Sequence, residues 1–211
     1  MKKARIAVLV SGGGTNLQAL IDAQQRDELG GGEIVAVISS KAGAYALERA
    51  SNAGIPGYVL PRKEFDSNRA MTLALVEKLK ALRIDLVVLA GCMVIFTEEL
   101  VQAYPNAIMN VHPALIPAFC GKGYYGLHGH EEALKYGVKL SGATVHFVSE
   151  ECDGGPIIAQ HAVPVLEGDT PETLQRRIME QAEWKLLPQA VSLFCQGRLS
   201  VVGRTVIIKE D

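Results

Sequence analysis

The sequence predicts an α/β protein in which a doubly wound, mostly parallel sheet is extended by antiparallel strands. Along the first half, short apolar runs alternate with longer segments whose apolar residues recur at helical spacing, the pattern of a parallel sheet with helices on both faces. In the second half, two long apolar runs are separated only by a glycine-ended loop, which indicates an antiparallel pair. The 211 residues can bury a substantial core. We expect one domain, 1–211, with a Rossmann-like half, 1–105, and a second half, 106–211.

Composition and charge exclude several classes of protein. Hydrophobic residues make up 48% and charged residues 21%, and the formal net charge is -2, so the chain as a whole is not basic enough to suggest nucleic acid or an anionic membrane as a partner. The longest apolar run, Leu86–Phe96, is too short to cross a bilayer. Four scattered cysteines favour reduced thiols in the cytoplasm, and no convincing metal cluster is present. We therefore expect small-molecule ligands and a monomer or homodimer.

In the first half, each expected strand is a short apolar run, and each expected helix shows apolar residues three to four positions apart. Glycine, proline or a capping residue separates them. The expected strands are Ala4–Val10, Glu33–Ser39, Tyr58–Leu60, Asp85–Ala90 and Ile108–Val111, and the expected helices begin near Leu17, cover Tyr45–Ala53 and Ser67–Leu82, and follow Thr97 as a short piece.

In the second half, the same signals predict a sheet extension and a long helix. Thr170 as a capping residue and Pro171 at the first helical position mark the start of that helix, and Pro188 is expected to kink it. The other expected elements are a short helix at Glu131–Tyr136, strands at Leu140–Ser149 and Ile157–Val165, and a terminal hairpin formed by Arg198–Val202 and Thr205–Ile208.

A glycine-rich loop, 11–16, follows the first strand and opens the first helix. Backbone N–H groups at such a helix start can hold a phosphate, and Thr15 or Asn16 is expected to be the N-cap. The third glycine of the dinucleotide fingerprint is missing, and no acidic residue ends the second strand. A small phosphate is therefore favoured over NAD, with a plain turn as the alternative, and 1–105 is expected to be a mononucleotide-binding half.

Asn110 and His112 lie one residue apart at the end of an expected strand, so their side chains point to the same side. Pro113 and Pro117 then stop regular structure. In an open α/β sheet, ligands bind at this end of the strands. A hydrogen-bonded structural histidine is the alternative.

Three further segments have both a functional and a structural interpretation. The apolar turn 93–96 could form the wall of a pocket for a flat heterocycle or plug the core. Asp153 lies in an acidic loop and Glu183 on a helix, and either could be a plain surface charge. His146 is expected to be a packed, hydrogen-bonded residue. His128 and His130 are two apart and do not share a helix face, so a metal site there is not expected.

Together these segments resemble the phosphoribosylglycinamide formyltransferases, folate-dependent enzymes of purine synthesis. The resemblance covers nearly the whole chain and depends on the order and spacing of its motifs rather than on any single one. The motifs are Ser11–Gln18, Leu89–Gly91 with Met93 close behind, Asn110–Pro117, Gly142–Val148 and Asp153–Pro156.

The resemblance implies a formyltransferase fold, with 106–211 as the catalytic and folate-binding half, and transfer of a formyl group from 10-formyltetrahydrofolate, a co-substrate, to the amine of glycinamide ribonucleotide without a metal. It implies roles by position. The catalytic trio is matched by Asn110, His112 and Asp153, and the phosphate loop by Gly14, Thr15 and Asn16. A carboxylate near the ribose and amine is matched by Glu183. The folate contacts are matched by Met93, Val94, Ile95, Phe96 and Asn110, by Asn68 for the tail, and by the backbone from Val148 to Asp153 for the pterin.

Three features depart from the family pattern. Val94 and Asn68 stand where many members have arginine, and Arg69 is adjacent here; both departures concern the folate tail. The loop Phe119–Tyr125 looks longer than in many relatives.

The chemistry of formyl transfer suits these residue types. An amine attacks the formyl carbon and creates a tetrahedral oxyanion, to which an amide N–H of Asn110 and an imidazolium N–H of His112 are suitable donors. A carboxylate beside His112, for which Asp153 is the candidate, would stabilise the imidazolium form and could assist proton transfer.

Three alternatives stay open. Formyltetrahydrofolate deformylases give the formyl group to water but carry an N-terminal regulatory domain, for which a first strand beginning at Ala4 leaves no room. Methionyl-tRNA formyltransferases add a C-terminal tRNA-binding domain, whereas this chain ends soon after the core and is not basic. A non-catalytic nucleotide-binding module is the third.

Overall fold

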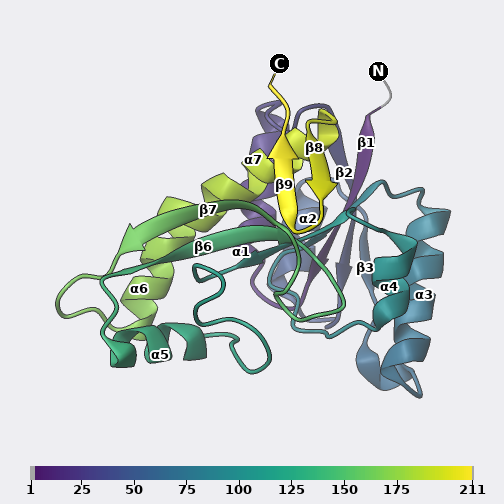
Figure 1. Cartoon of the computed structure of the whole chain (residues 1–211). Helices are drawn as coiled ribbons and strands as arrows, with labels where there is room; N and C mark the ends of the chain where they lie inside the picture. Colours follow the sequence, from purple (N-terminus) through teal and green to yellow (C-terminus); the bar gives the residue numbers. More distant parts are fainter. Residues whose placement is uncertain (1–2, 211) are drawn as a thin grey trace.

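The computed structural model describes residues 3–210 and contains a nine-stranded sheet with the order β3-β2-β1-β4-β5-β6-β7-β9-β8 (Figure 1). Neighbouring strands from β3 to β5 are parallel, whereas β5–β6, β6–β7 and β8–β9 are antiparallel. The predicted fold class, a mostly parallel sheet with an antiparallel extension, is confirmed.

The element boundaries lie close to the predicted ones. The strands are β1 Ala4–Val10, β2 Gly32–Ser39, β3 Gly57–Val59, β4 Leu86–Leu89, β5 Ile108–His112, β6 Leu140–Phe147, β7 Ile157–Pro164, β8 Leu199–Val202 and β9 Thr205–Ile208. The helices are α1 Thr15–Gln25, α2 Tyr45–Asn52, α3 Asn68–Ala81, α4 Glu98–Ala103, α5 His128–Tyr136, α6 Pro171–Ile178 and α7 Trp184–Cys195, with a 3-10 turn at Arg62–Glu64 and a π turn at Met179–Glu183. No helix among residues 3–210 is long and apolar enough to cross a membrane.

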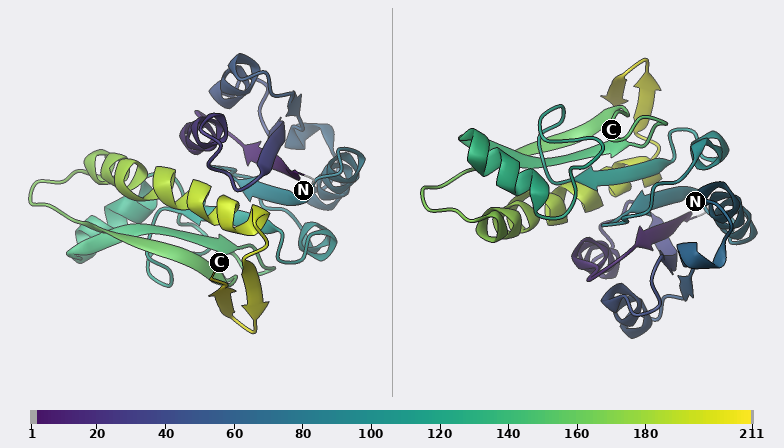
Figure 2. Two further views of the ribbon diagram at one scale, coloured as in Figure 1. Left: turned by 90° about the horizontal axis from the view of Figure 1, so that it is seen from above. Right: turned by 90° about the horizontal axis from the view of Figure 1, so that it is seen from below.

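Strand β1 separates two hydrophobic cores because successive side chains of a strand point to opposite faces. Ile6, Val8 and Val10 pack into the core shared with α1, α2 and α7, whereas Ala7 and Leu9 pack into the core shared with α3 and α4. Figure 2 shows these helices on the two faces of the sheet. Both faces of the central strands are therefore covered, and ligands have access at the ends of the strands.

One predicted detail is wrong. The N-cap of α1 is Gly14 rather than Thr15 or Asn16, because the chain enters the helix through a left-handed conformation (φ 72°) that glycine adopts without strain. The long second-half helix leaves α geometry at Met179–Glu183, and Pro188 lies inside α7, where a kink stays a prediction. The predicted start is confirmed: Thr170 caps α6 and Pro171 is its first residue.

Candidate functional site

Asp153 lies beside Asn110 in the middle of β5 and His112 at its end. Its Oδ2 atom is 3.5 Å from His112 Nδ1, and its Oδ1 atom is 3.5 Å from Asn110 Nδ2. The loop between β6 and β7 brings Asp153 here by passing close to the end of β6 at Gly155. A Cβ at Gly155 would lie 1.7 Å from the Phe147 carbonyl oxygen, so only glycine fits there. The predicted trio is therefore assembled at the carboxyl end of β5.

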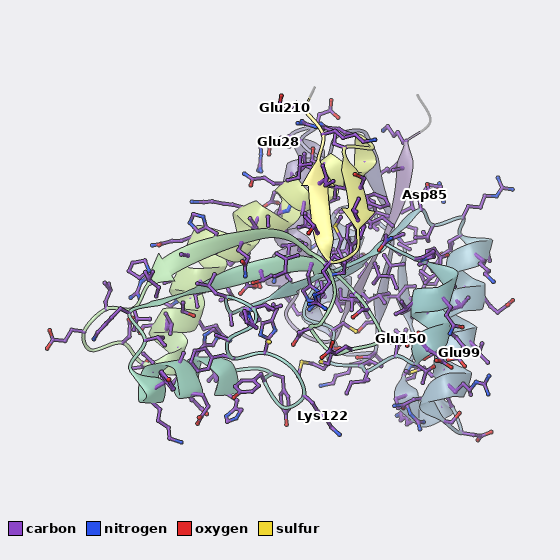
Figure 3. The ribbon with its side chains drawn as sticks, viewed as in Figure 1. Glu28, Asp85, Glu99, Lys122, Glu150 and Glu210 are labelled. Atoms are coloured by element: carbon purple, nitrogen blue, oxygen red, sulfur yellow. The ribbon has the colours of Figure 1, made fainter. Side chains whose placement is uncertain are left out.

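Two loops meet at this end of the sheet. In Figure 3, Lys122, from the loop after β5, and Glu150, from the loop between β6 and β7, lie below Asp85, which directly precedes β4 and so marks its amino end. The backbone N–H of Gly121 donates a 2.8 Å hydrogen bond to Asp153 Oδ2, which joins the two loops directly. The loop after β5 thus covers the trio.

Asp153 is ionised at neutral pH although its side chain is only 10% exposed. Burial raises the pKa of this carboxyl, but the hydrogen bond with His146, the charge of His112 and the Gly121 N–H lower it more, and the pKa falls to about 2. The alternative of a solvated acidic turn is therefore wrong.

Both ring nitrogens of His112 face acceptor oxygens. Nε2 donates to the Phe119 carbonyl at 2.9 Å, and Nδ1 faces the Asp153 carboxylate. A carbonyl accepts only, so this geometry suits the doubly protonated imidazolium. The side chain is 6% exposed, and a substrate oxygen would have to replace the Phe119 carbonyl to receive the Nε2 proton's hydrogen bond.

His146 is the residue that sequence reasoning left outside the site. It is packed and hydrogen-bonded as expected, at 1% exposure, but it pairs across the antiparallel strands with Asn110. Its Nδ1 donates to the Phe147 carbonyl at 2.8 Å, and its Nε2 lies 3.3 Å from Asn110 Nδ2 and 3.6 Å from Asp153 Oδ1. Directly opposite residues of antiparallel strands share a face of the sheet, so the register of β5 and β6 puts His146 on the same face as Asn110. The sequence alone does not give that register.

The phosphate-loop candidates and Glu183 come together. Asn16 Nδ2 donates to Glu183 Oε2 at 2.6 Å, and Thr15 Oγ1 lies 3.8 Å from the sulfur of Met179. Glu183 is only 5% exposed, so its alternative as a surface charge is wrong. Burial raises its pKa, which the Asn16 hydrogen bond partly offsets.

The expected folate contacts in the segment 93–96, called the wall below, differ in exposure. Met93 and Ile95 are 54% and 67% exposed, whereas Val94 and Phe96 line a cavity of about 10 Å³, which is too small for a heterocycle. Sequence reasoning passed over Ser11, whose hydroxyl accepts a hydrogen bond from the Met93 N–H at 2.8 Å. That bond ties the wall to the start of the phosphate loop.

Asn68 begins α3, is exposed, and accepts a hydrogen bond from Arg62 Nε. No hydrogen bond or ion pair joins Asn68 to the trio among residues 3–210. The structure therefore leaves its folate role a prediction.

The two histidines of α5 lie in different surroundings. His128 is half exposed and lies 3.5 Å from Glu131, whereas His130 is 1% exposed and neither of its ring nitrogens has a hydrogen-bond partner among residues 3–210. Burial and the charge of His112 lower the pKa of His130 to about 4. Within the part of the chain that the structure describes, no group of three or more His, Cys, Asp or Glu is placed to hold a metal.

A carboxylate, an imidazole and an amide at the carboxyl end of a Rossmann-like sheet define a class of protein that can stabilise an oxyanion and move a proton without further groups. The family model described as formyl transferase matches residues 4–191, and the chain belongs to that family.

Two named relatives are similar in sequence to this protein along nearly its whole length. The chain is 44% identical over 199 residues to phosphoribosylglycinamide formyltransferase of Haemophilus influenzae, covering 94% of this chain and 90% of the relative. It is also 44% identical over 212 residues to the trifunctional purine biosynthetic protein adenosine-3 of Bos taurus, covering all of this chain but only 20% of that protein. The chain thus spans about a fifth of the trifunctional relative.

Solved structures confirm the fold. Glycinamide ribonucleotide transformylase 1 from Symbiobacterium toebii superimposes with a TM-score of 0.93 at 46% identity, covering 99% of this chain and 95% of that one. A formyltetrahydrofolate deformylase from Pseudomonas syringae superimposes with a TM-score of 0.87 at 27% identity, covering 99% of this chain and 66% of that one.

Proposed function

We propose that this protein transfers the formyl group of 10-formyltetrahydrofolate to the amine of glycinamide ribonucleotide, a step of purine synthesis. The observation that carries the proposal is the contact of the Asp153 carboxylate with both Asn110 and His112. The names of the most similar relatives support the same donor and acceptor.

The order of the strands supports a proposed acceptor site beside the trio. β1 and β5 are separated only by β4, so their carboxyl ends lie about 10 Å apart. A ribonucleotide whose phosphate binds the backbone N–H groups of Gly14, Thr15 and Asn16 can extend its amine toward His112 over such a span. Glu183, held by Asn16, then lies between the phosphate and the amine.

The chemistry proceeds by addition and elimination. The amine nitrogen forms a bond to the formyl carbon, and the carbonyl electron pair moves to oxygen. His112 Nε2–H, released from Phe119, and Asn110 Nδ2–H donate to this oxyanion, each donor contributing ~3 kcal/mol to the barrier reduction. Collapse breaks the bond to the folate nitrogen. Asp153, through an ordered water, takes the proton lost by the amine and returns one to the departing nitrogen.

The folate is proposed to bind along Met93, Val94, Ile95 and Phe96, with the 148–153 backbone at its pterin and Asn68 near its tail. The wall must shift to admit the heterocycle, because the cavity behind it is so small. No metal takes part in this proposal. A cytoplasmic location, and a monomer or homodimer, stay predictions.

The deformylase is the second candidate, because a deformylase shares the fold over 99% of this chain. An absorbance assay for loss of the formyl group from 10-formyltetrahydrofolate, with and without glycinamide ribonucleotide, separates the two. Turnover that requires the ribonucleotide supports the transferase. Turnover at the same rate without it supports the deformylase and overturns the proposal.

A further inference from the structure

The phosphate loop is anchored from behind by α2. The Gly12 carbonyl accepts a hydrogen bond from the Ala46 N–H at 3.1 Å, and the Gly13 carbonyl accepts one from Arg49 Nε at 2.8 Å. Two consecutive carbonyls of the loop are therefore held by the same helix, one by its backbone and the other by a guanidinium.

Holding a carbonyl also sets the direction of the next N–H, because the two groups of a trans peptide point in opposite directions. The N–H groups of Gly13 and Gly14 are thus turned away from α2. Neither N–H has an acceptor among residues 3–210. A Cβ at Gly13 would meet nothing within 4 Å, so the loop is open on that part of its surface, whereas one at Gly14 would lie 2.6 Å from the Ala46 Cβ.

Besides the Gly13 carbonyl, Arg49 contacts two neighbours, Gln18 and Tyr45. Its Nη1 donates to Gln18 Oε1 at 2.9 Å, and Gln18 Nε2 donates to Asp22 Oδ1 at 2.7 Å. The guanidinium also lies 5.0 Å from the centre of the Tyr45 ring, within the range of a cation–π contact. The side chain therefore has one orientation, linking α1, α2 and the loop.

Arg49 brings a positive charge into contact with the loop. The segment 11–16 contains no lysine or arginine, so an anion bound there would meet backbone dipoles and the neutral side chains of Ser11, Thr15 and Asn16, but no charge from the loop itself. A charge one peptide away strengthens such dipoles, because the local dielectric is lower than that of water.

We propose that Arg49 is a positioning residue for the acceptor's phosphate, acting through the Gly13 carbonyl to aim the Gly13 and Gly14 N–H groups and supplying the charge that balances the phosphate. The inference rests on the proposed function for the identity of the acceptor. It concerns a residue that touches the loop rather than the substrate.

The test compares an acceptor with and without its phosphate. In Arg49→Ala, we expect the KM for glycinamide ribonucleotide to rise roughly 10-fold or more, with kcat within about twofold, since a hydrogen bond to a charged group is lost. The kcat/KM for the dephosphorylated riboside should not change. Equal losses on both acceptors, or no loss on either, would overturn the proposal.

Arg26→Ala is the matched control. Arg26 lines the same cavity of about 240 Å³ beside α1 as Arg49, but it pairs with Glu28 rather than with the loop. Removing this charge should leave the KM for the ribonucleotide unchanged. An equal rise in both variants would show that only the general charge of this face matters, against the proposal.

A binding measurement separates failure of this inference from failure of the proposed function. Titration of the wild-type protein with inorganic phosphate, followed by ³¹P NMR, should show binding that Arg49→Ala weakens roughly 10-fold and Arg49→Lys restores only in part, since lysine keeps the charge but not the fork. That result would stand even if no formyl transfer occurred. Equal phosphate affinity in wild type, Arg49→Lys and Arg49→Ala overturns the inference. If the alanine variant does not fold, the affinity of Arg49→Lys alone is compared with that of wild type.

Discussion

The side-chain amide of Asn16 donates a 2.6 Å hydrogen bond to the buried carboxylate of Glu183, 167 positions later in the chain. The bond joins the first turn of α1 to the π turn before α7. π turns are frequent at functional sites, and this one turns Glu183 toward the phosphate loop. The two ends of the expected acceptor site are therefore held together by one short contact.

Glu183→Gln tests whether the carboxylate has a role beyond this bond. Glutamine can still accept from Asn16, so the melting temperature should stay within a few degrees of wild type, while the KM for the ribonucleotide rises roughly 10-fold because the charge is lost. Steady-state kinetics and a thermal melt measure both. Glu183→Leu, which leaves the Asn16 amide without its partner, should also lose ~1–3 kcal/mol of stability. An unchanged KM in the glutamine variant would limit Glu183 to a structural role.

His112→Ala tests the oxyanion donor. Formyl transfer should fall by about 10²–10³-fold, because one donor to the developing charge is gone. The affinity for the ribonucleotide, measured by calorimetry, should hardly change. His161→Ala, which removes an exposed histidine of β7, is the control and should keep full turnover. Near-normal turnover in the His112 variant would remove it from the mechanism.

His130 predicts a loss of stability in mild acid. Its pKa is about 4 in the folded chain, against 6.5 for an ordinary histidine, so the unfolded chain takes up the proton more readily. Above pH 6.5, His130 therefore does not reduce the free energy of unfolding. As the pH falls from 6.5 toward 4, that free energy declines by ~3 kcal/mol in all, at ~1.4 kcal/mol per pH unit. Urea unfolding at pH 7.5 and 5.0 measures the decline. His130→Leu should reduce it, and an identical decline in that variant would contradict the assignment.

The ion pair of Asp169 and Arg177 predicts a purely structural effect. Asp169 also accepts from the Leu166 N–H and from Thr173, and its side chain is only 4% exposed. Asp169→Ala should cost ~3 kcal/mol of stability, since it leaves Arg177 without its carboxylate, and should not alter kcat. Glu28→Ala breaks the exposed pair with Arg26 and should cost much less, because solvent screens that pair. Comparable losses in chemical unfolding of the two variants would contradict the difference in burial.

Much of this structure could be predicted from local patterns in the sequence. The strand Ala4–Val10 is predicted to the residue because its segment is apolar apart from Arg5, with lysines before it and glycines shortly after it. Asn110 and His112 could be recognised because alternation puts them on one side of a strand that ends in proline. The contact of Asp153 with both required the family resemblance, since its own loop resembles an ordinary acidic turn.

What the sequence did not show depends on packing between distant segments. The burial of Glu183 follows from the contact of the π turn with α1, and no local pattern marks it. His146 looks like any polar residue of a strand until the register of β5 and β6 pairs it with Asn110. Arg49 looks like a surface charge of α2, because only the fold brings that helix behind the glycine loop.

The most direct measurement follows the formyl group itself. Donor carrying a ¹³C-labelled formyl group is incubated with the ribonucleotide and the wild-type protein, and the label is located by NMR. The account predicts that the label appears on the amine of the glycinamide, and that Asp153→Asn slows its arrival by orders of magnitude. Label that accumulates as free formate, or that reaches the amine equally fast without the Asp153 carboxylate, would contradict it.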